Sequence, residues 1–547
     1  MKQLKRKIAD EITETIGTKV GPKDIEVPDD MDHGDFAYPA MKAASELKKD
    51  PREIAEDLAE EAEELEFLDK TEVAGPGYIN FFVDRSFYAE KAVETLESEN
   101  MGVKQREGSV LVEFSSPNVA KPMHVGHFRN NALGDSLQRI LDFVGYDVTS
   151  ENYLGDWGTQ YGKLIYAFKQ FGSEEEFKAE PMEHMFELYV RFHEEMKDDE
   201  EMEEKGQEWA AKIEEGDEEA VQLWEMFRDA SIDYHRQDYK RMGVDFDRWT
   251  GESKVVEPAV DLIEKWIEEG KLERDEDGSV FYEFERDLPG AVLLKSDNST
   301  LYITRDLYNL KKRNEEGFDY NFYVVASEQD LHFKQVFAAA EELGLDPEGA
   351  EHISYGMLSL PEGSMSSRSG RIIRLEDAMD EARDRAAEVS EEGVQNAEEV
   401  GLAALRYANL AVSRKKDIEF SWDRALSFEG DSGPYLQYSN VRAKSILAET
   451  GEEGEIAGEP DEMEHAIVKK LGEFPETVDA AAEQREPAKI ANYLSELCEE
   501  FNSFYHEKPV LDADEEARQR RLKIVSLFIE VTDVGLELLG IRPLKEM

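Results

Sequence analysis

The chain has almost no cysteine and no long apolar run, and both absences narrow what it can be. Its single cysteine among 547 residues, Cys498, excludes an internal disulfide and any zinc site built from several cysteines. Cys498 lies in a helical, mostly apolar pattern, which predicts a small core residue. No apolar run reaches the roughly eighteen residues of a membrane span, and the amino-terminal segment lacks the apolar core of a secretory signal. We therefore expect a cytoplasmic protein without a membrane partner.

Basic residues are also scarce, since 64 Lys and Arg face 125 Asp and Glu and give a formal net charge of −61. The simplest interpretation is a solvated acidic surface. Because the acid is spread along the whole chain, it favours adaptation to a salt-rich cytoplasm, and the composition resembles that of proteins from extreme halophiles. Such a charge opposes binding of nucleic acid. At about 1 M salt, however, the Debye length falls to about 3 Å and most of that repulsion is screened.

The length of the chain predicts about three domains. Residues 1–98 have the pattern of a small α/β unit that includes the strand Tyr78–Val83. Residues 99–375 alternate strands and helices, as in a parallel sheet, with a helical and acidic insertion at about 173–242. Residues 376–547 are nearly all helical. The predicted fold class is α/β, with a Rossmann-type parallel-sheet catalytic domain, a helical insertion, a small N-terminal α/β domain and a C-terminal all-α helical bundle.

The segment Glu113–His127 is the most informative part of the sequence. The apolar run Val110–Phe114 predicts a buried strand, and a helix with one apolar face follows. His124 and His127 therefore fall near the amino end of a helix, where unpaired backbone N–H groups attract anions. Gly126 has no side chain to block a ligand. A His-x-Gly-His match should occur by chance only about 0.01 times in such a chain, so we predict a site for nucleotide phosphates.

Two further segments fit the same chemistry. Gly155 and Asp156 end the next predicted strand, where open α/β sheets bind ligands. Much later, the loop Gly363–Gly370 follows the predicted strand His352–Leu358 and is rich in glycine and serine. Its hydroxyls and N–H groups could surround phosphate oxygens, and Arg368 could neutralise them. Taken alone, this loop would be an ordinary surface loop.

Together the two loops resemble the HIGH and KMSKS signatures of class I aminoacyl-tRNA synthetases, and their context resembles the arginyl-tRNA synthetases. The resemblance extends over essentially the whole chain and rests on five segments, namely Glu113–His127, Asn152–Gln160, Tyr302–Asp306, Ser327–Phe333 and Gly433–Arg442. It implies that the chain ligates L-arginine to tRNA(Arg). ATP would first be used to form arginyl-adenylate, and the arginyl group would then pass to the 2′-hydroxyl of the terminal adenosine.

The resemblance also implies which residues act. Catalysis by positioning and by stabilising phosphate charge would involve Lys121, His124, Gly126, His127, Met365, Ser366, Ser367 and Arg368. L-arginine would be held by Glu113, Asn118, Tyr302, Asp306 and Gln329. ATP would be bound by Pro122, His124, Gly126, His127, Gly155, Asp156 and Ser366. tRNA would be bound by Phe36 and Asn80 in the N-terminal domain and by Tyr435, Tyr438 and Arg442 in the helical domain.

The arginine pocket can be checked against physical chemistry. A guanidinium is best recognised by a carboxylate that accepts two parallel hydrogen bonds. Tyr302 and Asp306 lie four residues apart at a predicted helix start and so share a face. By resemblance, Asp306 would pair with the guanidinium. Phosphate contacts for tRNA are expected at two basic patches, Arg414–Lys416 and Arg518–Lys523.

The chain departs from the KMSKS pattern because both lysines are missing, and Ser369 replaces another lysine that is common in the family. Either Arg368 or Lys121 could supply the missing charge. ATP is expected to bring Mg²⁺, for which the sequence shows no dedicated protein site, and a monomer is expected. The alternatives are a cysteinyl-tRNA synthetase, which needs zinc ligands that one cysteine cannot supply, a small nucleotidyltransferase, which needs no long helical tail, and an inactive RNA-binding relative.

Overall fold

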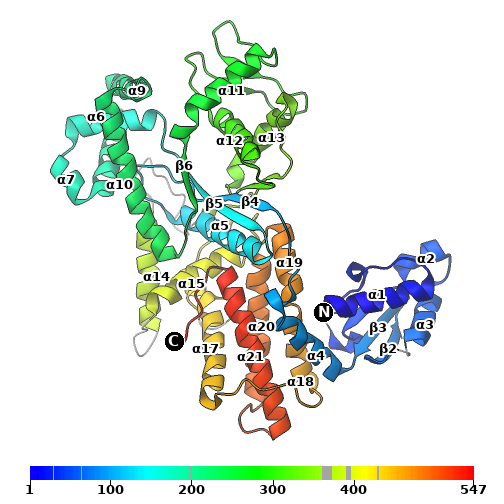
Figure 1. Cartoon of the computed structure of the whole chain (residues 1–547). Coiled ribbons are helices and arrows are strands. Elements are labelled where there is room, and N and C mark those ends of the chain that lie inside the picture. The colour runs from blue at the N-terminus through cyan, green and yellow to red at the C-terminus, as the bar shows by residue number, and fades with distance from the viewer. Residues whose placement is uncertain (29, 63–64, 196–199, 360–372, 390–395, 428–429) are drawn as a thin grey trace.

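A five-stranded parallel sheet lies at the centre of the molecule, between two lobes and a helical bundle (Figure 1). The computed structural model describes the whole chain except residues 29, 63–64, 196–199, 360–372, 390–395 and 428–429. The strand order in the sheet is β10-β9-β4-β5-β6. The strands are β4 (Ser109–Glu113), β5 (Asp147–Leu154), β6 (Arg248–Gly251), β9 (Tyr320–Tyr323) and β10 (Ala350–His352). The predicted parallel sheet is thereby confirmed.

The order of the strands fixes where a ligand can bind. From β4 the chain moves first to β5 and β6 on one side, and later to β9 and β10 on the other. The gap between the carboxyl ends of β4 and β9 is therefore the topological switch point, where open α/β sheets bind ligands. The backbone N–H of Val324, just beyond β9, donates to the carbonyl oxygen of Glu113 at 2.9 Å. Glu113 thus stands at that point.

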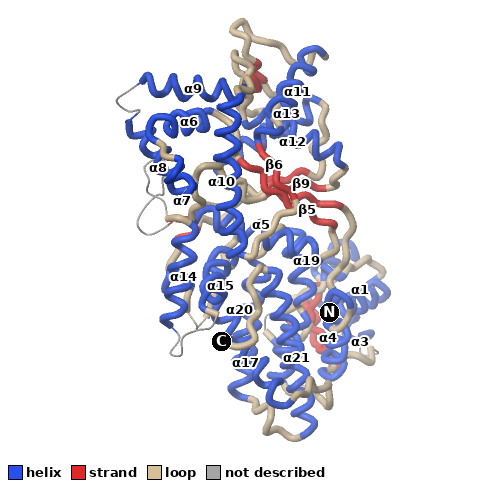
Figure 2. Tube along the Cα trace, turned by 60° about the vertical axis from the view of Figure 1, so that its left-hand side comes forward, coloured by secondary structure: helices blue, strands red, loops and turns tan. Residues whose placement is uncertain are grey.

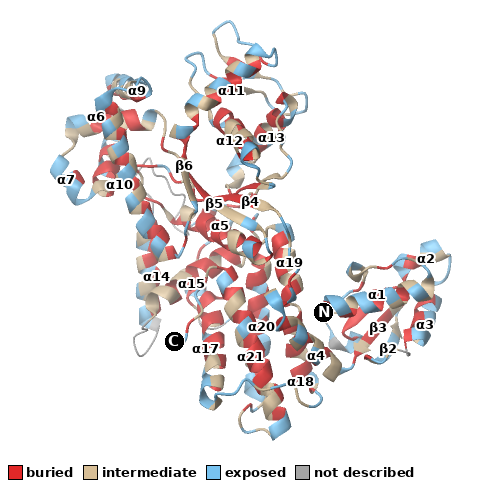
Figure 3. Ribbon diagram, viewed as in Figure 1, coloured by how far each residue is buried: buried red, intermediate tan, exposed pale blue. Residues whose placement is uncertain are grey.

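Helix α5 (Val125–Phe143) covers the sheet on the side of the bundle. Its close approach depends on Gly134, because a Cβ there would lie 2.2 Å from Cγ of Phe114. Most of α5 is buried, in agreement with its place between sheet and bundle (Figure 3). The close approach at Gly134 and the burial of α5 therefore place this helix directly against the sheet.

Two lobes rise beyond the other side of the sheet (Figures 1 and 2). One is helical, as predicted for the insertion, and consists of α6 (Thr159–Phe171), α7 (Glu174–Ala179), α8 (Pro181–Glu195), α9 (Glu200–Glu214) and α10 (Glu218–Met242). The other contains α11 (Val256–Glu268), β7 (Val280–Tyr282), β8 (Ala291–Leu294), α12 (Tyr302–Glu316) and α13 (Asp330–Leu343). Each lobe has its own apolar cluster, so each can hold its shape independently.

The N-terminal domain is a small α/β unit, as predicted. It comprises α1 (Lys2–Ile16), β1 (Phe36–Pro39), α2 (Met41–Leu47), α3 (Pro51–Ala62), β2 (Leu68–Ala74) and β3 (Tyr78–Val83), with an antiparallel sheet ordered β1-β3-β2. Helix α4 (Arg85–Leu96) then leads to the helical bundle. The domain is fixed to the bundle by Asp35, whose Oδ1 lies 2.7 Å from Nε2 of His465 in a buried contact.

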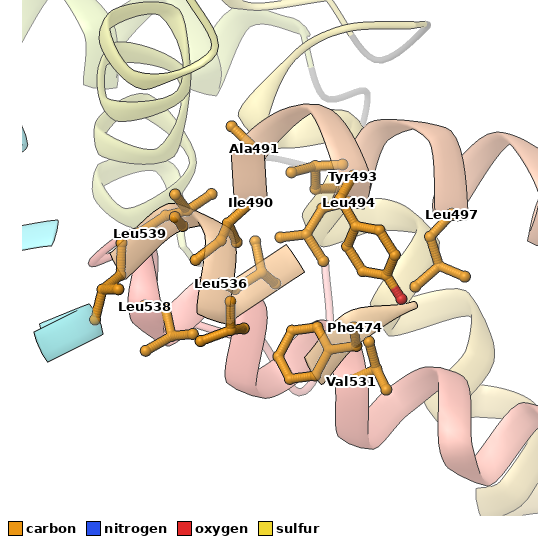
Figure 4. Close-up of a cluster of buried hydrophobic side chains, with 14 of the residues drawn as sticks. Phe474, Ile490, Ala491, Tyr493, Leu494, Leu497, Val531, Leu536, Leu538 and Leu539 are labelled. Carbon is orange, nitrogen blue, oxygen red and sulfur yellow. The ribbon is translucent and has the colours of Figure 1, made fainter. Parts of the chain in front are cut away.

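The C-terminal part is an all-α bundle with an apolar core (Figure 4). Its helices are α14 (Leu375–Val389), α15 (Ala397–Leu410), α16 (Trp422–Ala425), α17 (Gly433–Thr450), α18 (Glu462–Gly472), α19 (Phe474–Gln484), α20 (Ala488–Glu507) and α21 (Glu515–Leu538). Phe474, Leu494 and Val531 are among the core side chains that Figure 4 labels. Cys498 is fully buried, which confirms its predicted place in the core.

One predicted strand, His352–Leu358, is wrong as a single element. Strand β10 ends at His352, and the chain then leaves the main sheet to form β11 (Leu358–Ser359), which pairs in parallel with β12 (Ile418–Glu419). The change of partner occurs at Gly356, whose N–H donates to the carbonyl oxygen of Arg414 at 2.7 Å. An apolar sequence pattern cannot reveal such a change of partner.

A single buried guanidinium joins α5 to this region. Arg129 is fully buried, and burial lowers its pKa to about 10. It donates to four backbone carbonyl oxygens, those of Gly356 at 2.8 Å and of Asn409, Arg414 and Lys416 at 3.0 Å each. A planar fork of five N–H groups can serve several acceptors at once, whereas an ammonium has only three donors. Arg129 therefore ties α5 to the chain on both sides of the boundary between the catalytic domain and the bundle.

Replacing Arg129 should reveal this role. Arg129→Met leaves buried carbonyl oxygens without donors, so we expect a loss of more than about 3 kcal/mol in the free energy of unfolding, and a smaller loss for Arg129→Lys. Urea unfolding at fixed salt measures both. Arg139→Met, on the same helix but with a side chain 38% exposed, is the matched control and should cost less than about 1 kcal/mol. Equal losses for Arg129→Met and Arg139→Met would contradict this role.

Candidate active site

The amino end of α5 presents two imidazoles side by side. His124 is the N-cap residue, and its Nδ1 accepts the N–H of Gly126 at 3.1 Å. Nδ1 of His127 accepts the N–H of His124 at 3.1 Å, and the two ring centroids lie 4.0 Å apart. Because each Nδ1 is an acceptor, the proton of each neutral ring is on Nε2. Both Nε2–H groups can then donate to a ligand at the helix end.

Burial lowers the pKa of His124, and it lowers that of His127 well below the ordinary value of 6.5. Both rings are therefore neutral donors at pH 7. Gly126 permits the arrangement, since a Cβ there would lie 2.9 Å from Cε1 of the His124 ring. Together with the unpaired N–H groups of the helix end, these donors suit an anionic ligand such as phosphate.

The second predicted loop lies outside the described residues, and with it Met365, Ser366, Ser367 and Arg368. The chain directly after it does lie at the histidine pair. The N–H of Val125 donates to the carbonyl oxygen of Ile373 at 3.2 Å, and that of Leu375 to Met123 at 2.9 Å. The fold thus brings the ends of the two predicted phosphate loops together. Arg374, which the sequence analysis missed, lies between these contacts and pairs with Glu183 of α8 at 2.5 Å.

Lys121 and Pro122 lie in the loop before the histidines. Pro122 is buried. Nζ of Lys121 lies 4.3 Å from the ring centroid of Tyr189 in α8, which is a cation–π contact. The insertion lobe therefore orients this lysine.

Helix α10 holds the same loop from behind, which the sequence analysis did not foresee. Ser115, Ser116 and Ala120 have φ values of 72°, 47° and 62°, a region that non-glycine residues seldom adopt and keep only where their surroundings fix it. The Ser231 hydroxyl accepts the N–H of Ala120 at 3.0 Å, and the Tyr239 hydroxyl contacts Oγ of Ser115 at 2.6 Å. The spacing of polar residues on the inner face of α10 was the only sequence signal.

Glu113 is buried at the end of β4, beside the predicted arginine pocket. Arg313 of α12 forms ion pairs with both Glu113 and Glu151. Arg248 adds a second cation, 3.1 Å from Glu151. Burial nevertheless raises the pKa of Glu113 to about 7, against the opposing effect of Arg313. The site therefore takes up a further positive charge favourably.

Tyr302 and Asp306 occupy the first two turns of α12, as predicted. The Tyr302 side chain is 66% exposed, and the guanidinium of Arg305 lies 4.8 Å from its ring centroid. Oδ2 of Asp306 lies 2.6 Å from Nε2 of His332 in α13. The charge of Asp306 contributes to the raised pKa of Glu113, so the two predicted arginine ligands lie close together.

A buried carboxylate that the sequence analysis missed lies near Asp306. Glu252 begins the 3₁₀ turn Glu252–Lys254, directly after β6, and is buried. Burial raises its pKa to about 7, and Asp306 adds to that rise, although Arg305 lies 3.3 Å away and opposes it. An acidic residue directly after a strand at the ligand edge was the available signal.

The remaining residues predicted to bind arginine or ATP differ in their burial and in their contacts. Asn118 lies against Gly155, where a Cβ would be only 2.5 Å from its Oδ1. Gln329 is exposed at the amino end of α13. Asp156 is buried and accepts the N–H and the hydroxyl of Ser253 at 2.8 and 2.7 Å. Its carboxylate is thus bound by the protein itself.

The predicted tRNA contacts need correction in the N-terminal domain. Phe36 is 1% exposed and Asn80 is 4% exposed, so neither side chain can touch RNA in this structure. Phe36 stacks instead on Tyr88 of α4, with ring centroids 6.4 Å apart. Strand alternation did not reveal this, because both faces of β1 are covered.

The bundle does carry an exposed aromatic site. Tyr438 is 41% exposed and Tyr505, which the sequence analysis missed, is 38% exposed. The guanidinium of Arg442 lies 4.7 and 5.4 Å from their ring centroids and donates to Oδ1 of Asn502 at 2.8 Å. The half-buried Tyr435 accepts a hydrogen bond from the same asparagine at 3.0 Å. Such a platform suits an unstacked base.

Three arginines of the two basic patches serve the fold instead. Arg414 is buried and donates to the carbonyl oxygen of Arg485 at 2.9 Å. Arg520 and Arg521 both donate to the buried Glu464 at 2.7 Å. The expectation that these cations face tRNA phosphates is therefore wrong for those three arginines. Among the described residues, no group of three or more His, Cys, Asp or Glu could hold a metal ion, and no helix is long and apolar enough to cross a membrane.

Comparisons with known proteins agree with this geometry. The family model "tRNA synthetases class I (R), catalytic domain" matches residues 92–422, which includes both histidines and every element of the central sheet. The chain belongs to the arginyl-tRNA synthetase family. The model of the arginyl-tRNA synthetase N-terminal domain matches residues 2–83, and that of the DALR anticodon binding domain matches residues 436–547.

Individual relatives span nearly the whole chain. It is 38% identical to the arginine–tRNA ligase of Halothermothrix orenii over 540 residues, covering 96% of this chain and 95% of that one. It is also 38% identical to the arginine–tRNA ligase of Clostridioides difficile over 564 residues, covering 100% and 98%. The solved arginyl-tRNA synthetase of Thermus thermophilus matches with a TM-score of 0.82 at 26% identity, covering 100% of both chains. The cysteinyl and nucleotidyltransferase alternatives are thereby excluded.

Proposed function

We propose that this chain is an arginine–tRNA ligase, which forms arginyl-adenylate from L-arginine and ATP and passes the arginyl group to the 2′-hydroxyl of the terminal adenosine of tRNA(Arg). One observation supports this most directly. Donors for phosphate at His124 and His127 and a pocket of buried carboxylates at Glu113 and Glu252 lie at the same edge of one sheet. The family to which the chain belongs supports the same reaction.

In the first step, the arginine carboxylate attacks the α-phosphorus of ATP and pyrophosphate leaves. The Nε2–H groups of His124 and His127 and the amino end of α5 stabilise negative charge on the phosphate oxygens, and one such donor is typically worth about 10²–10³ in rate. Asp306 and Glu252 bind the guanidinium beside Tyr302, and Glu113 attracts the ammonium. No side chain acts as a nucleophile, because positioning and charge stabilisation suffice.

Mg²⁺ would enter as part of the MgATP substrate and supply charge neutralisation on the phosphates. Asn118, Gln329 and Gly155 line the edges of the two substrate sites in this proposal. Met365, Ser366, Ser367 and Arg368, within residues 360–372, supply the remaining predicted contacts with the phosphates of ATP. The exposed Tyr438, Arg442 and Tyr505 bind the tRNA, with Tyr435 holding Asn502 in place. Phe36 and Asn80 do not contact the tRNA in this proposal; they stabilise the fold of the N-terminal domain.

The wider setting follows from the composition. We propose a monomer that works in a salt-rich cytoplasm, since the net charge of −61 is tolerable only where counterions screen it. We also propose that residues 1–98 bind the tRNA elbow, that residues 99–375 carry the chemistry and that residues 376–547 bind the anticodon.

Pyrophosphate exchange tests the reaction directly. With L-arginine, ATP and tRNA(Arg) at high salt, we expect arginine-dependent exchange of labelled pyrophosphate into ATP, together with charging of the tRNA. His124→Ala and His127→Ala should each lower the exchange rate by about 10²-fold or more. Absence of exchange with and without tRNA would leave an RNA-binding protein without this activity.

The missing lysines of the second loop make Lys121 the cation whose removal should matter most. Lys121→Ala should lower the rate of arginine activation more than Ser369→Ala does, because only Lys121 brings a full positive charge. Single-turnover adenylate formation measures the difference. Comparable rates for the two variants would show that Lys121 does not replace the lost lysine.

The raised pKa values of Glu113 and Glu252, both about 7, make arginine binding depend on pH. Below pH 7 these carboxyls are largely protonated, so the pocket has less negative charge for the cationic substrate. KM for arginine should therefore fall several-fold as pH rises from about 6 to about 8. Glu252→Gln should raise KM and flatten this dependence, whereas Glu257→Gln, at an exposed position five residues further on, should do neither. A KM that is independent of pH would contradict the role of these carboxyls.

A further inference from the structure

Every carboxylate of the arginine pocket already has a partner within the protein. The two buried glutamates are each matched by an arginine, a permanent cation. Asp306 is matched differently, because its Oδ2 lies 2.6 Å from Nε2 of His332. A ring nitrogen of histidine offers one N–H donor to a carboxylate, whereas the guanidinium of an arginine can engage both carboxylate oxygens at once. This contact therefore leaves acceptor positions of Asp306 available, which an arginine in the same place would occupy.

The His332 ring packs against an aromatic pair. It lies in the first turn of α13 (Asp330–Leu343), and its ring meets that of Phe333 edge-on, at 5.2 Å and 79°. Phe333 is stacked in turn on His352, at 4.3 Å and 24°. The amino end of α13 also favours negative charge nearby, which suits the carboxylate of Asp306. Asp306 is thus fixed from a helix other than its own.

The contact uses only part of what a carboxylate can accept. A carboxylate has about four acceptor positions on two oxygens, and the His332 donor occupies one of them. Because a hydrogen bond from a rigid ring restricts rotation of the carboxylate, the remaining positions lie in a defined plane. A guanidinium needs such a plane, since its two parallel N–H groups must meet two oxygen lone pairs together. A lysine-type ammonium is a point charge with rotatable donors and does not need it.

We infer that His332 is a specificity-determining positioning residue, which fixes the plane of the Asp306 carboxylate so that the pocket selects a guanidinium over an ammonium. This inference rests on the proposed function, because it takes Asp306 as the partner of the substrate guanidinium. It assigns His332 no part in the chemical step. His332 should therefore affect the binding and choice of the amino acid and leave the turnover rate nearly unchanged.

Two substitutions of similar size separate the hydrogen bond from the packing. His332→Gln keeps an N–H donor, whereas His332→Met has none. In arginine-dependent pyrophosphate exchange with tRNA(Arg) and ATP, we expect His332→Met to raise KM for arginine by about tenfold, the equivalent of about 1.4 kcal/mol, while kcat changes by less than about threefold. The preference for arginine over ornithine and lysine, measured as the ratio of kcat/KM values, should fall by a similar factor. His332→Gln should recover most of both losses.

The neighbouring His352 provides the control for packing. It stacks on the same Phe333, but its Nε2 contacts the carbonyl oxygen of Val325 at 3.0 Å. His352→Met should therefore leave KM and the preference for arginine unchanged. These two quantities do not depend on the folded fraction, so they remain decisive even if a variant is less stable.

Three outcomes would overturn the inference. They are an unchanged KM and preference in His332→Met, equal defects in the Met and Gln variants at position 332, and an equal defect in His352→Met. If the unaltered protein itself showed no arginine-dependent exchange, the proposed function would fall, and the inference with it. Activity of the unaltered protein together with any of the three outcomes would overturn the inference alone.

Discussion

The catalytic domain depends on the burial of carboxylates at the carboxyl edge of its central sheet. Glu113, Glu151 and Glu252 are all buried there, and an isolated buried charge is very costly. Arg313, reaching from α12 to Glu113 of β4 and Glu151 of β5 together, compensates both charges and joins these two neighbouring strands. The same ion pairs set the position of α12, and with it the places of Tyr302 and Asp306.

Arg313 and Arg305 only partly offset the cost of burying Glu113 and Glu252, and this leaves a role for the cationic substrate. Burial raises the pKa values of Glu113 and Glu252 to about 7, and Arg313 and Arg305 oppose this rise only in part, so each carboxyl is about half protonated at pH 7 before a cation binds. A substrate with a guanidinium and an ammonium supplies the missing positive charge. At the other end of the site the histidine pair is neutral, so it donates to phosphate without repelling the cationic amino acid nearby. In the proposed reaction, the two substrates therefore meet at a boundary between an acidic region and a neutral donor site.

Local sequence patterns predicted the parts of this account that local structure determines. The segment Glu113–His127 predicted the strand, the loop and a helix that starts near His124 and His127, because apolar periodicity and turn residues report directly on those features. Tyr302 and Asp306 were correctly placed on one helix face by their spacing alone. The α/β fold class followed from the alternation of strand and helix patterns, and the reaction followed from the resemblance of five segments to one family.

What the sequence could not supply depends on contacts between distant segments. Glu252 joins the pocket only because β6 lies at the edge of the sheet, and α10 supports the loop before His124 from more than a hundred residues away. Phe36 and Asn80 were expected at the surface. Phe36 is buried because both faces of β1 are covered, and Asn80 of β3 is buried where it pairs with Ala37 of β1. Arg520 and Arg521 look like a cationic patch in sequence, yet Glu464 binds both.

The central claim is that arginine completes an under-neutralised carboxylate pocket, and proton release on binding measures this most directly. Isothermal titration of L-arginine into the protein with tRNA(Arg) at pH 7, repeated in buffers of different ionisation enthalpy, gives the number of protons released. Because Glu113 and Glu252 are each about half protonated at that pH, the account predicts release of up to about one proton per arginine bound, falling towards zero by about pH 9. Binding without proton release at pH 7, or with proton uptake, would contradict it.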